Sequence, residues 1–168
     1  LYEVDDFLNA AVPDVHKYPL DLKKDEESEA ICYDKRNDQL ILAFKNHKKY
    51  DITPELFAFG ISTKKLLDSS VVKINLTNLV LRKKDRDNVK KQWEPADIAI
   101  DIPNNKLFIL DAINNHLMEL TLNGEFIKLT PIDGKKIHHA EGIAINADGS
   151  LYLCNDANNE GKEKLLNW

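Results

Sequence analysis

The chain has 168 residues, of which 43% are hydrophobic and 30% are charged, a balance typical of one globular domain with a sizeable core. Its formal net charge of −5 at pH 7 argues against nucleic-acid binding, which needs a basic face. No apolar run approaches the roughly 18 residues of a membrane-spanning helix, so we expect no transmembrane span. The chain opens on Leu1, and we expect a longer natural precursor.

The amino-terminal third contains short apolar runs separated by polar turns. We interpret "YEVDDFL" and "VHKYPLDL" as the closing strands of a preceding unit. Residues 30–43, "AICYDKRNDQLILA", predict a β-hairpin, because two apolar runs flank a turn rich in Asp and Asn. Two more strands are predicted at 56–61 and 71–76, separated by "STKKLLDSS".

The hairpin plan of residues 30–43 returns twice, in "DIAIDIPNNKLFIL" at 97–110 and in "GIAINADGSLYLC" at 142–154. The middle copy continues through "HLMELTL", an Asn-Gly pair and "EFIKLTPI", and Asn-Gly between alternating apolar runs is a strong hairpin signal. The final "EKLLNW" predicts a third strand after the last copy. One repeat is therefore a four-stranded antiparallel meander of about 45 residues.

Repeats of this kind predict an all-β fold, a β-propeller of four-stranded antiparallel blades. About three and a half blades are present, and we interpret 1–168 as a single partial domain of a larger propeller. The alternatives are that the first and last pieces pair to complete a blade, or that two chains associate. The expected blades are 1–28 (the end of a blade), 29–76, 96–133 and 140–168 (incomplete), with 77–95 as a connector. The open blade edges at both ends predict self-association. Cys32 and Cys154 lie inside apolar runs, and we expect buried free thiols.

Antiparallel order predicts which polar residues share a face. Residues just before the first strand of a blade and just after the second gather at the same end of the sheet. The predicted channel mouth and ligand-binding face thus holds Glu29, Glu94, Asp97, Glu141, Lys45, Asp111, Asn155 and Asp156. The turns "DKRND", "DIPNN" and "NADG" fall on the opposite face.

Three of these acids, Glu29, Asp97 and Glu141, start innermost strands and are candidates to converge at the channel mouth. Carboxylates gathered there repel one another unless a cation, a proton or Lys45 offsets their charge. Calcium, which accepts about six to eight oxygen ligands, is the candidate cofactor. The alternative is that these acids are hydrated or accept hydrogen bonds from backbone N–H groups of neighbouring blades.

Four segments carry a family resemblance: "EAICYDKRNDQLILAFK", "EPADIAIDIPNNKLFILD", "LMELTLNGEFIKLTPID" and "AEGIAINADGSLYLCND". In this order they resemble successive blades of the SdiA-regulated family, bacterial proteins related to NHL-like propellers. "EGKEKLLNW" is similar to that family's closing segment. The resemblance implies the carboxyl-terminal portion of a six-bladed ring, extracytoplasmic (periplasmic or from a membrane-anchored precursor), with no established activity.

Two functions remain open from the sequence. The first is a non-catalytic propeller that binds a cell-envelope ligand or a protein partner. The alternative is a calcium-dependent hydrolase of the lactonase or esterase type, which the more distant resemblance to gluconolactonase-like and paraoxonase-like propellers implies. No nucleophile elbow, phosphate-binding glycine loop or H-E-x-x-H pattern occurs, so no catalytic residue is assigned.

Overall fold

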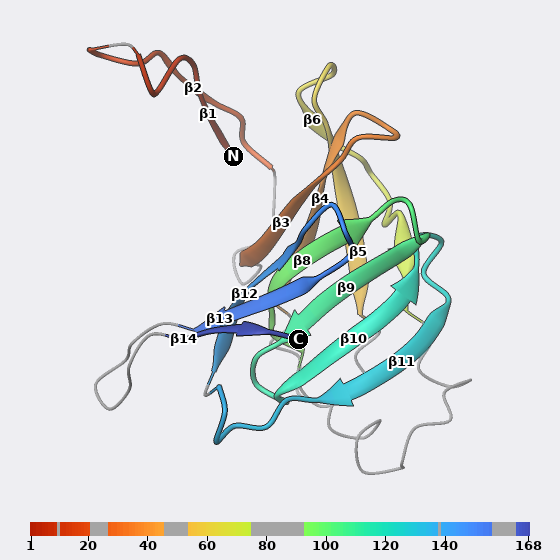
Figure 1. Cartoon of the computed structure of the whole chain (residues 1–168). Coiled ribbons are helices and arrows are strands. Elements are labelled where there is room, and N and C mark those ends of the chain that lie inside the picture. Colours follow the sequence, from red (N-terminus) through yellow and green to blue (C-terminus); the bar gives the residue numbers. More distant parts are fainter. Residues whose placement is uncertain (10, 21–26, 46–53, 75–92, 138, 156–163) are drawn as a thin grey trace.

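The computed structural model describes residues 1–9, 11–20, 27–45, 54–74, 93–137, 139–155 and 164–168. Within these ranges the chain forms antiparallel β-sheets and no helix, which confirms the predicted all-β fold (Figure 1). Nothing in the described ranges has the length and apolar character of a membrane-crossing helix. The predicted connector at 77–95 lies outside the described residues, except for its last three positions.

The amino-terminal hairpin is the first of four sheets. β1 (Tyr2–Val4) pairs antiparallel with β2 (Val15–Lys17). The hairpin is anchored to the next sheet by aromatic contact, since the rings of Tyr18 and Phe59 lie 5.9 Å apart between centroids. The two segments interpreted as closing strands of a preceding unit therefore form one sheet together.

The second sheet contains β3 (Ser28–Asp34), β4 (Gln39–Phe44), β5 (Glu55–Gly60), β6 (Lys65–Leu66) and β7 (Val72–Lys73). Both β6 and β7 pair with β5, so the fourth strand of this sheet is interrupted. The short strand β6 forms inside "STKKLLDSS", the segment that separates the two predicted strands. The chain reverses tightly at Lys64, whose φ is 55°, and the N–H of Leu67 then donates to the carbonyl of Ala58 at 2.8 Å.

The third sheet is a four-stranded meander of β8 (Pro95–Asp101), β9 (Lys106–Asp111), β10 (His116–Thr121) and β11 (Phe126–Pro131). The hairpin predicted at Asn-Gly is confirmed, with φ of 85° at Gly124. The N–H of Thr121 donates to the carbonyl of Glu125 at 2.7 Å, which leaves a three-residue loop between them.

The fourth sheet contains β12 (Ala140–Ile145), β13 (Leu151–Asn155) and β14 (Lys164–Asn167). The third strand predicted in "EKLLNW" is confirmed, because β14 pairs with β13. The predicted repeat is visible in the registers, where Ile31 lies opposite Leu42, Ile98 opposite Ile109, and Ile143 opposite Leu153.

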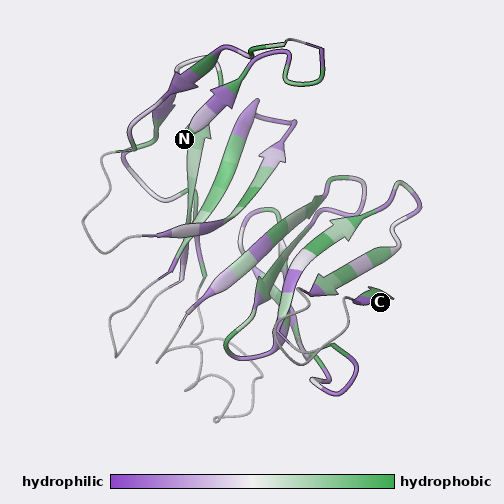
Figure 2. Cartoon of the chain, turned by 90° about the vertical axis from the view of Figure 1, so that its left-hand side faces the viewer, coloured by the Kyte–Doolittle hydropathy of each residue, from purple (hydrophilic) through white to green (hydrophobic). Residues whose placement is uncertain are grey.

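The innermost strands lie side by side, with β8 between β3 and β12 (Figure 1). Two apolar clusters fill the spaces on either side of the third sheet, and hydrophobic segments accordingly concentrate in the strands (Figure 2). Neighbouring residues of β9 serve both clusters: Ile109 packs toward the second sheet and Leu110 toward the fourth. Because side chains alternate along a strand, the third sheet is buried on both faces.

The fourth sheet differs, because apolar side chains on one of its faces stay exposed. Leu165 on β14 is 71% exposed, and Cys154, opposite it on β13, is also exposed. Both cysteines are free thiols, as predicted, but the expected burial of Cys154 was wrong. Cys32 is partly buried, and burial, reinforced by the charge of Asp97, raises the pKa of its thiol to about 12.

Candidate binding site

One end of the sheets, where β3, β8 and β12 begin, is called the mouth. The strand registers place Asp111 opposite Pro95 and Asn155 opposite Ala140, so the ends of β9 and β13 also lie there. Asn155 accepts a hydrogen bond at Oδ1 from the backbone N–H of Lys164 at 3.0 Å. Asp156 lies outside the described residues.

Lys45 brings a positive charge to the mouth. Its Nζ lies 2.6 Å from Oε1 of Glu29, so the structure brings these two predicted site residues together. The Glu29 hydrogen bond raises the pKa of Lys45 against the opposing effect of burial, and the negative charges of Glu94 and Glu27 raise it further. Lys45 therefore offsets part of the repulsion expected among the carboxylates gathered at the mouth.

Asp111 is the most buried acid of the mouth, with 0% of its surface exposed. Its Oδ2 accepts a hydrogen bond from Nδ2 of Asn114 at 2.8 Å. Burial raises the pKa of Asp111 to about 7, and the charge of Glu94 acts in the same direction. His116, itself 6% exposed, lies opposite on β10. Burial thus favours the protonated form of Asp111, which lowers the negative charge at the mouth.

Asp97 bridges two sheets through backbone hydrogen bonds. Its Oδ1 accepts from the N–H of Ile98 at 2.9 Å and its Oδ2 from the N–H of Ile143 at 2.8 Å. Burial raises the pKa of Asp97, and the two backbone hydrogen bonds oppose that rise. This arrangement matches the alternative to metal binding given in the sequence analysis, in which an acid accepts a hydrogen bond from a backbone N–H of the neighbouring sheet.

The three acids proposed for calcium do not occupy equivalent places. Each inner strand carries a register shift at its start, and the residue passed over is Glu29 in β3, Ala96 in β8 and Glu141 in β12. Asp97 lies one residue further, where the neighbouring inner strands have Ala30 and Gly142. A one-residue step sends a side chain to the other face of a strand.

These residues do not fit a calcium site on their own. The described ranges hold no group of three or more His, Cys, Asp or Glu side chains placed to share a metal ion. Glu29 is ion-paired, and both carboxylate oxygens of Asp97 already accept backbone hydrogen bonds. Calcium binding therefore stays a prediction for titration to test.

A turn of the form Asp-x-x-Asn recurs in the second and third sheets, twice at the end opposite the mouth and once at the mouth. In three turns the Asn side-chain Nδ2 donates to the Asp carboxylate, at 2.9, 2.8 and 2.8 Å. The pairs are Asp34–Asn37, Asp101–Asn104 and Asp111–Asn114. The next residue has positive φ in every case, which Asn and Asp tolerate better than most residues. The first two turns join β3 to β4 and β8 to β9, and the third closes β9 at the mouth.

The first of these turns holds an arginine. Arg36 donates from Nε to Oδ1 of Asp34 at 2.9 Å and from Nη2 to Oδ2 at 3.1 Å. Asp34 is 1% exposed, and burial opposes its ionisation, but hydrogen bonds from Arg36 and Asn37 outweigh that effect and lower its pKa. The pKa therefore falls at Asp34 and rises at Asp111 in the same kind of turn, and Ile113 stands at the arginine's position in the second case.

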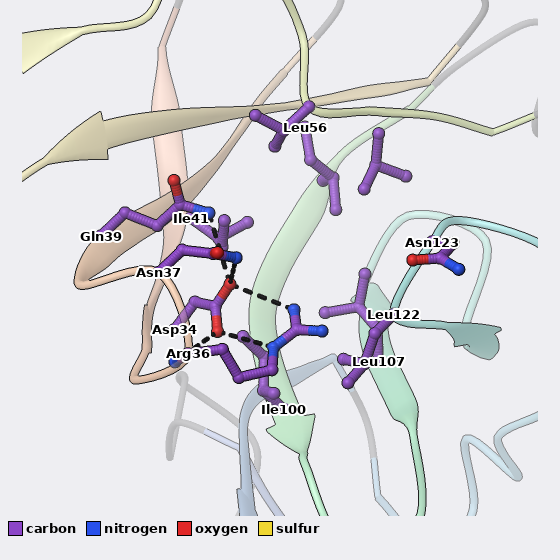
Figure 3. Close-up of a pocket in the computed structure, with 12 residues that line it drawn as sticks. Asp34, Arg36, Asn37, Gln39, Ile41, Leu56, Ile100, Leu107, Leu122 and Asn123 are labelled. Atoms are coloured by element: carbon purple, nitrogen blue, oxygen red, sulfur yellow. Dashed lines mark hydrogen bonds and ion pairs between the residues drawn. The ribbon is translucent and has the colours of Figure 1, made fainter.

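A cavity of about 450 Å³ opens beside this turn, between the second and third sheets (Figure 3). Its lining combines an aliphatic floor with a polar wall. The aliphatic residues are Ile41, Leu56, Val71, Val72, Ile100, Leu107 and Leu122, and the polar residues are Asp34, Arg36, Asn37, Gln39 and Asn123. The volume lies within the range of about 300–1,000 Å³ usual for small-molecule sites.

The sequence analysis assigned the ligand to the mouth and missed this cavity. Its polar residues come from "DKRND" and the Asn-Gly turn, which were interpreted as connections on the opposite face. The available signal was Arg36 two residues after a strand-ending Asp34, because an arginine beside a buried carboxylate is held in a fixed orientation. The floor residues carried no such signal, since they have the spacing of ordinary core positions.

Comparison with known proteins places the fold and the family. A chain from a nidogen–laminin complex matches with a TM-score of 0.51 and 13% identity, over 84% of this chain and 43% of that one. A Bacteroides caccae protein of unknown function matches with a TM-score of 0.52 and 10% identity, over 87% of this chain and 48% of that one. This chain thus spans about half the length of these β-propeller-like structures, and no curated protein matches its sequence. The SdiA-regulated family matches residues 3–159, and the chain belongs to that family.

Proposed function

We propose that this chain is part of a non-catalytic binding propeller of the bacterial cell envelope, and that it binds a small ligand or a segment of a protein partner between its second and third sheets. The observation that carries the proposal is the cavity, whose lining combines buried aliphatic residues such as Leu56 and Leu107 with Arg36. Ligand sites commonly combine an apolar lining with a few placed polar groups.

The mouth supports binding less well than the cavity does. Its acids have protein partners: Glu29 pairs with Lys45, and Asp97 accepts two backbone N–H groups. A hydrolase of the lactonase type would need a metal with an open coordination position and a carboxylate able to act as base. Metal analysis of the purified protein, followed by a panel of lactones and esters, tests this alternative; bound calcium with lactone turnover would overturn the non-catalytic proposal.

We propose a six-bladed ring for the complete protein, of which this chain supplies about three and a half blades. Four successive sheets and coverage of 43% and 48% of two propeller-like chains support this count. One of those chains comes from a complex of two proteins, which supports a protein partner as one kind of ligand. An experimental structure of the natural precursor tests the count, and cell fractionation tests the extracytoplasmic location.

The binding proposal is tested by a fragment screen of mixed charge, read from backbone amide resonances of the isotopically labelled chain. We expect hits to shift the signals of Val71, Leu107 and Leu122 together. Val71 lies at the cavity rim and is 39% exposed, so Val71→Trp should fill the opening and abolish these shifts. Val15→Trp, at a 58% exposed position on β2, is the matched control. A screen in which no fragment shifts the lining signals would refute the proposal.

A further inference from the structure

We infer that the cavity between the second and third sheets takes a carboxylate with an aliphatic chain, and that Arg36 binds the carboxylate. This inference rests on the proposed function and deepens it by naming the ligand class. It is drawn from the hydrogen bonds of Arg36, the chemistry of the wall and the shape of the floor.

The guanidinium of Arg36 has a second pair of donors free to bind. It presents five N–H groups, and the Nε–Nη2 side is used by Asp34. The described residues supply no hydrogen-bond partner for Nη1, and this nitrogen points away from Asp34 toward Leu122 (Figure 3). The Nη1–Nη2 edge has the spacing that matches the two oxygens of a carboxylate.

Asp34 holds this edge in place. Its carboxylate accepts five hydrogen bonds: from the backbone N–H, Nε and Nη2 of Arg36, and from the side-chain amides of Asn37 and Gln39. With its acceptor positions engaged, Asp34 has little capacity left for a ligand donor. It fixes the arginine before a ligand arrives, which reduces the entropy lost on binding.

The remaining wall also favours an acceptor-rich group. Asp34 is the one acid among the cavity residues in the described part of the chain, and the other polar groups are the amides of Asn37, Gln39 and Asn123. A ligand ammonium would face the guanidinium with no accessible counter-charge. A carboxylate would receive donors from Arg36 and nearby amides.

The floor selects the rest of the ligand. Ile41, Leu56, Val72 and Leu107 are each less than 9% exposed and offer aliphatic contacts without an aromatic ring. Gly124 lies close to this floor, because a Cβ there would stand 2.5 Å from Cγ1 of Val72. A flexible methylene chain fits between aliphatic walls of this kind better than a sugar, which usually stacks on an aromatic ring.

The test is calorimetric titration with butanoate, hexanoate and octanoate, and with hexanamide and hexylamine as matched head-group controls. We expect the carboxylates to bind about fourfold more tightly for each added methylene that the floor buries. Hexanamide should bind at least about tenfold more weakly than hexanoate, because it cannot accept at both positions of the arginine edge. Equal affinity for hexanoate and hexanamide would overturn the inference.

Asn123→Asp supplies a variant that keeps the fold. Asp suits the turn as well as Asn does, and the substitution adds a negative charge to the cavity wall. Octanoate affinity should fall about fivefold in low salt and recover with added salt. Asn146→Asp, with the same charge change in the β12–β13 turn outside the cavity lining, should bind like the wild type. Equal losses in both variants would also overturn the inference.

The outcomes separate this inference from the proposed function. If fragments of other chemistry shift the cavity signals while carboxylates do not, the ligand class is wrong and the binding function stands. If no fragment of any charge shifts them, both fail. Arg36→Lys gives a further check, since it keeps a positive charge beside Asp34 but loses the fork, and the preference for hexanoate over hexanamide should shrink about tenfold.

Discussion

Asp111 gives the protein a pH-dependent stability whose sign and size follow from its burial. The carboxyl has 0% exposure, and burial raises its pKa from an ordinary 3.8 to about 7. The folded state therefore holds the Asp111 proton more tightly than the unfolded state does. Unfolding releases this proton between about pH 4 and pH 7, so the free energy of unfolding falls as pH rises through that window. Three pKa units correspond to a loss on the order of 4 kcal/mol.

The variant Asp111→Asn removes this titration and keeps the shape of the side chain. The substituted side chain keeps one oxygen that can accept from Asn114, but its NH2 group replaces the other oxygen and faces Asn114 as a donor. This mismatch should lower the free energy of unfolding by about 1 kcal/mol at pH 4. At pH 8 the variant should instead be more stable than the wild type by roughly 3 kcal/mol, because it has no buried carboxylate to ionise. The crossing of the two stability curves is the expected result.

Urea unfolding at intervals between pH 4 and pH 8 measures these curves, with the fluorescence of Trp93, which is 1% exposed, as the reporter. Asp34→Asn is the control for a carboxyl shifted the other way: the lowered pKa of Asp34 stabilises the folded protein above its unfolded pKa, so this variant should be less stable than the wild type by a nearly constant amount from pH 4 to pH 8. His116→Asn separates the contribution of the imidazole opposite Asp111. Parallel curves for the wild type and Asp111→Asn would refute the reasoning.

Other contacts lead to expectations of the same kind. Asp97→Ala removes the acceptor of the Ile143 N–H and should lower the free energy of unfolding by about 1–3 kcal/mol, with Asp97→Asn losing less; equal stability of Asp97→Ala and the wild type would contradict this. Arg36→Ala leaves the Asp34 carboxylate buried without its guanidinium and should cost about 3 kcal/mol in urea unfolding, more than Arg36→Lys. Millimolar calcium should leave the midpoint of thermal unfolding at its value in EDTA, because the mouth acids already have protein partners. A rise of several degrees would instead support a calcium site. Sedimentation should show concentration-dependent self-association that Leu165→Glu weakens, and identical behaviour of the two proteins would exclude the exposed face of the fourth sheet as the contact.

The hairpins and their repeat could be predicted because they depend on neighbouring residues. Two apolar runs and the polar turn between them determine each hairpin register, including the cross-strand pairing of Ile31, Ile98 and Ile143. The interrupted strand at β6 and β7 could not be predicted in the same way. "STKKLLDSS" has the composition of a loop, and its pairing with β5 depends on the tight reversal at Lys64.

The candidate site was harder to predict than the fold, since it depends on contacts between repeats. Asp34 and Asp111 end equivalent-looking runs and make the same Asn hydrogen bond, yet their pKa values move in opposite directions. The difference is visible in the sequence as Arg36 against Ile113, but only the packing shows that both carboxyls are buried. The cavity likewise depends on how the second and third sheets lie together, which no local pattern specifies.

The role of Asp97 follows from the inner strands being sheet edges. β8 and β12 are the end strands of the third and fourth sheets, and an edge strand directs alternate N–H groups away from its own sheet. Such groups need acceptors when they are buried. Asp97 accepts from Ile98 and Ile143, the equivalent positions of two successive inner strands, so a single carboxylate satisfies one N–H group on each edge. A Cβ at Gly142 would stand 2.5 Å from Sγ of Cys154 but 3.9 Å from Oδ2 of Asp97, so this glycine makes room for the cysteine and not for the carboxylate. An acid at the start of an inner strand is thus explained by unpaired backbone donors, without a metal ion.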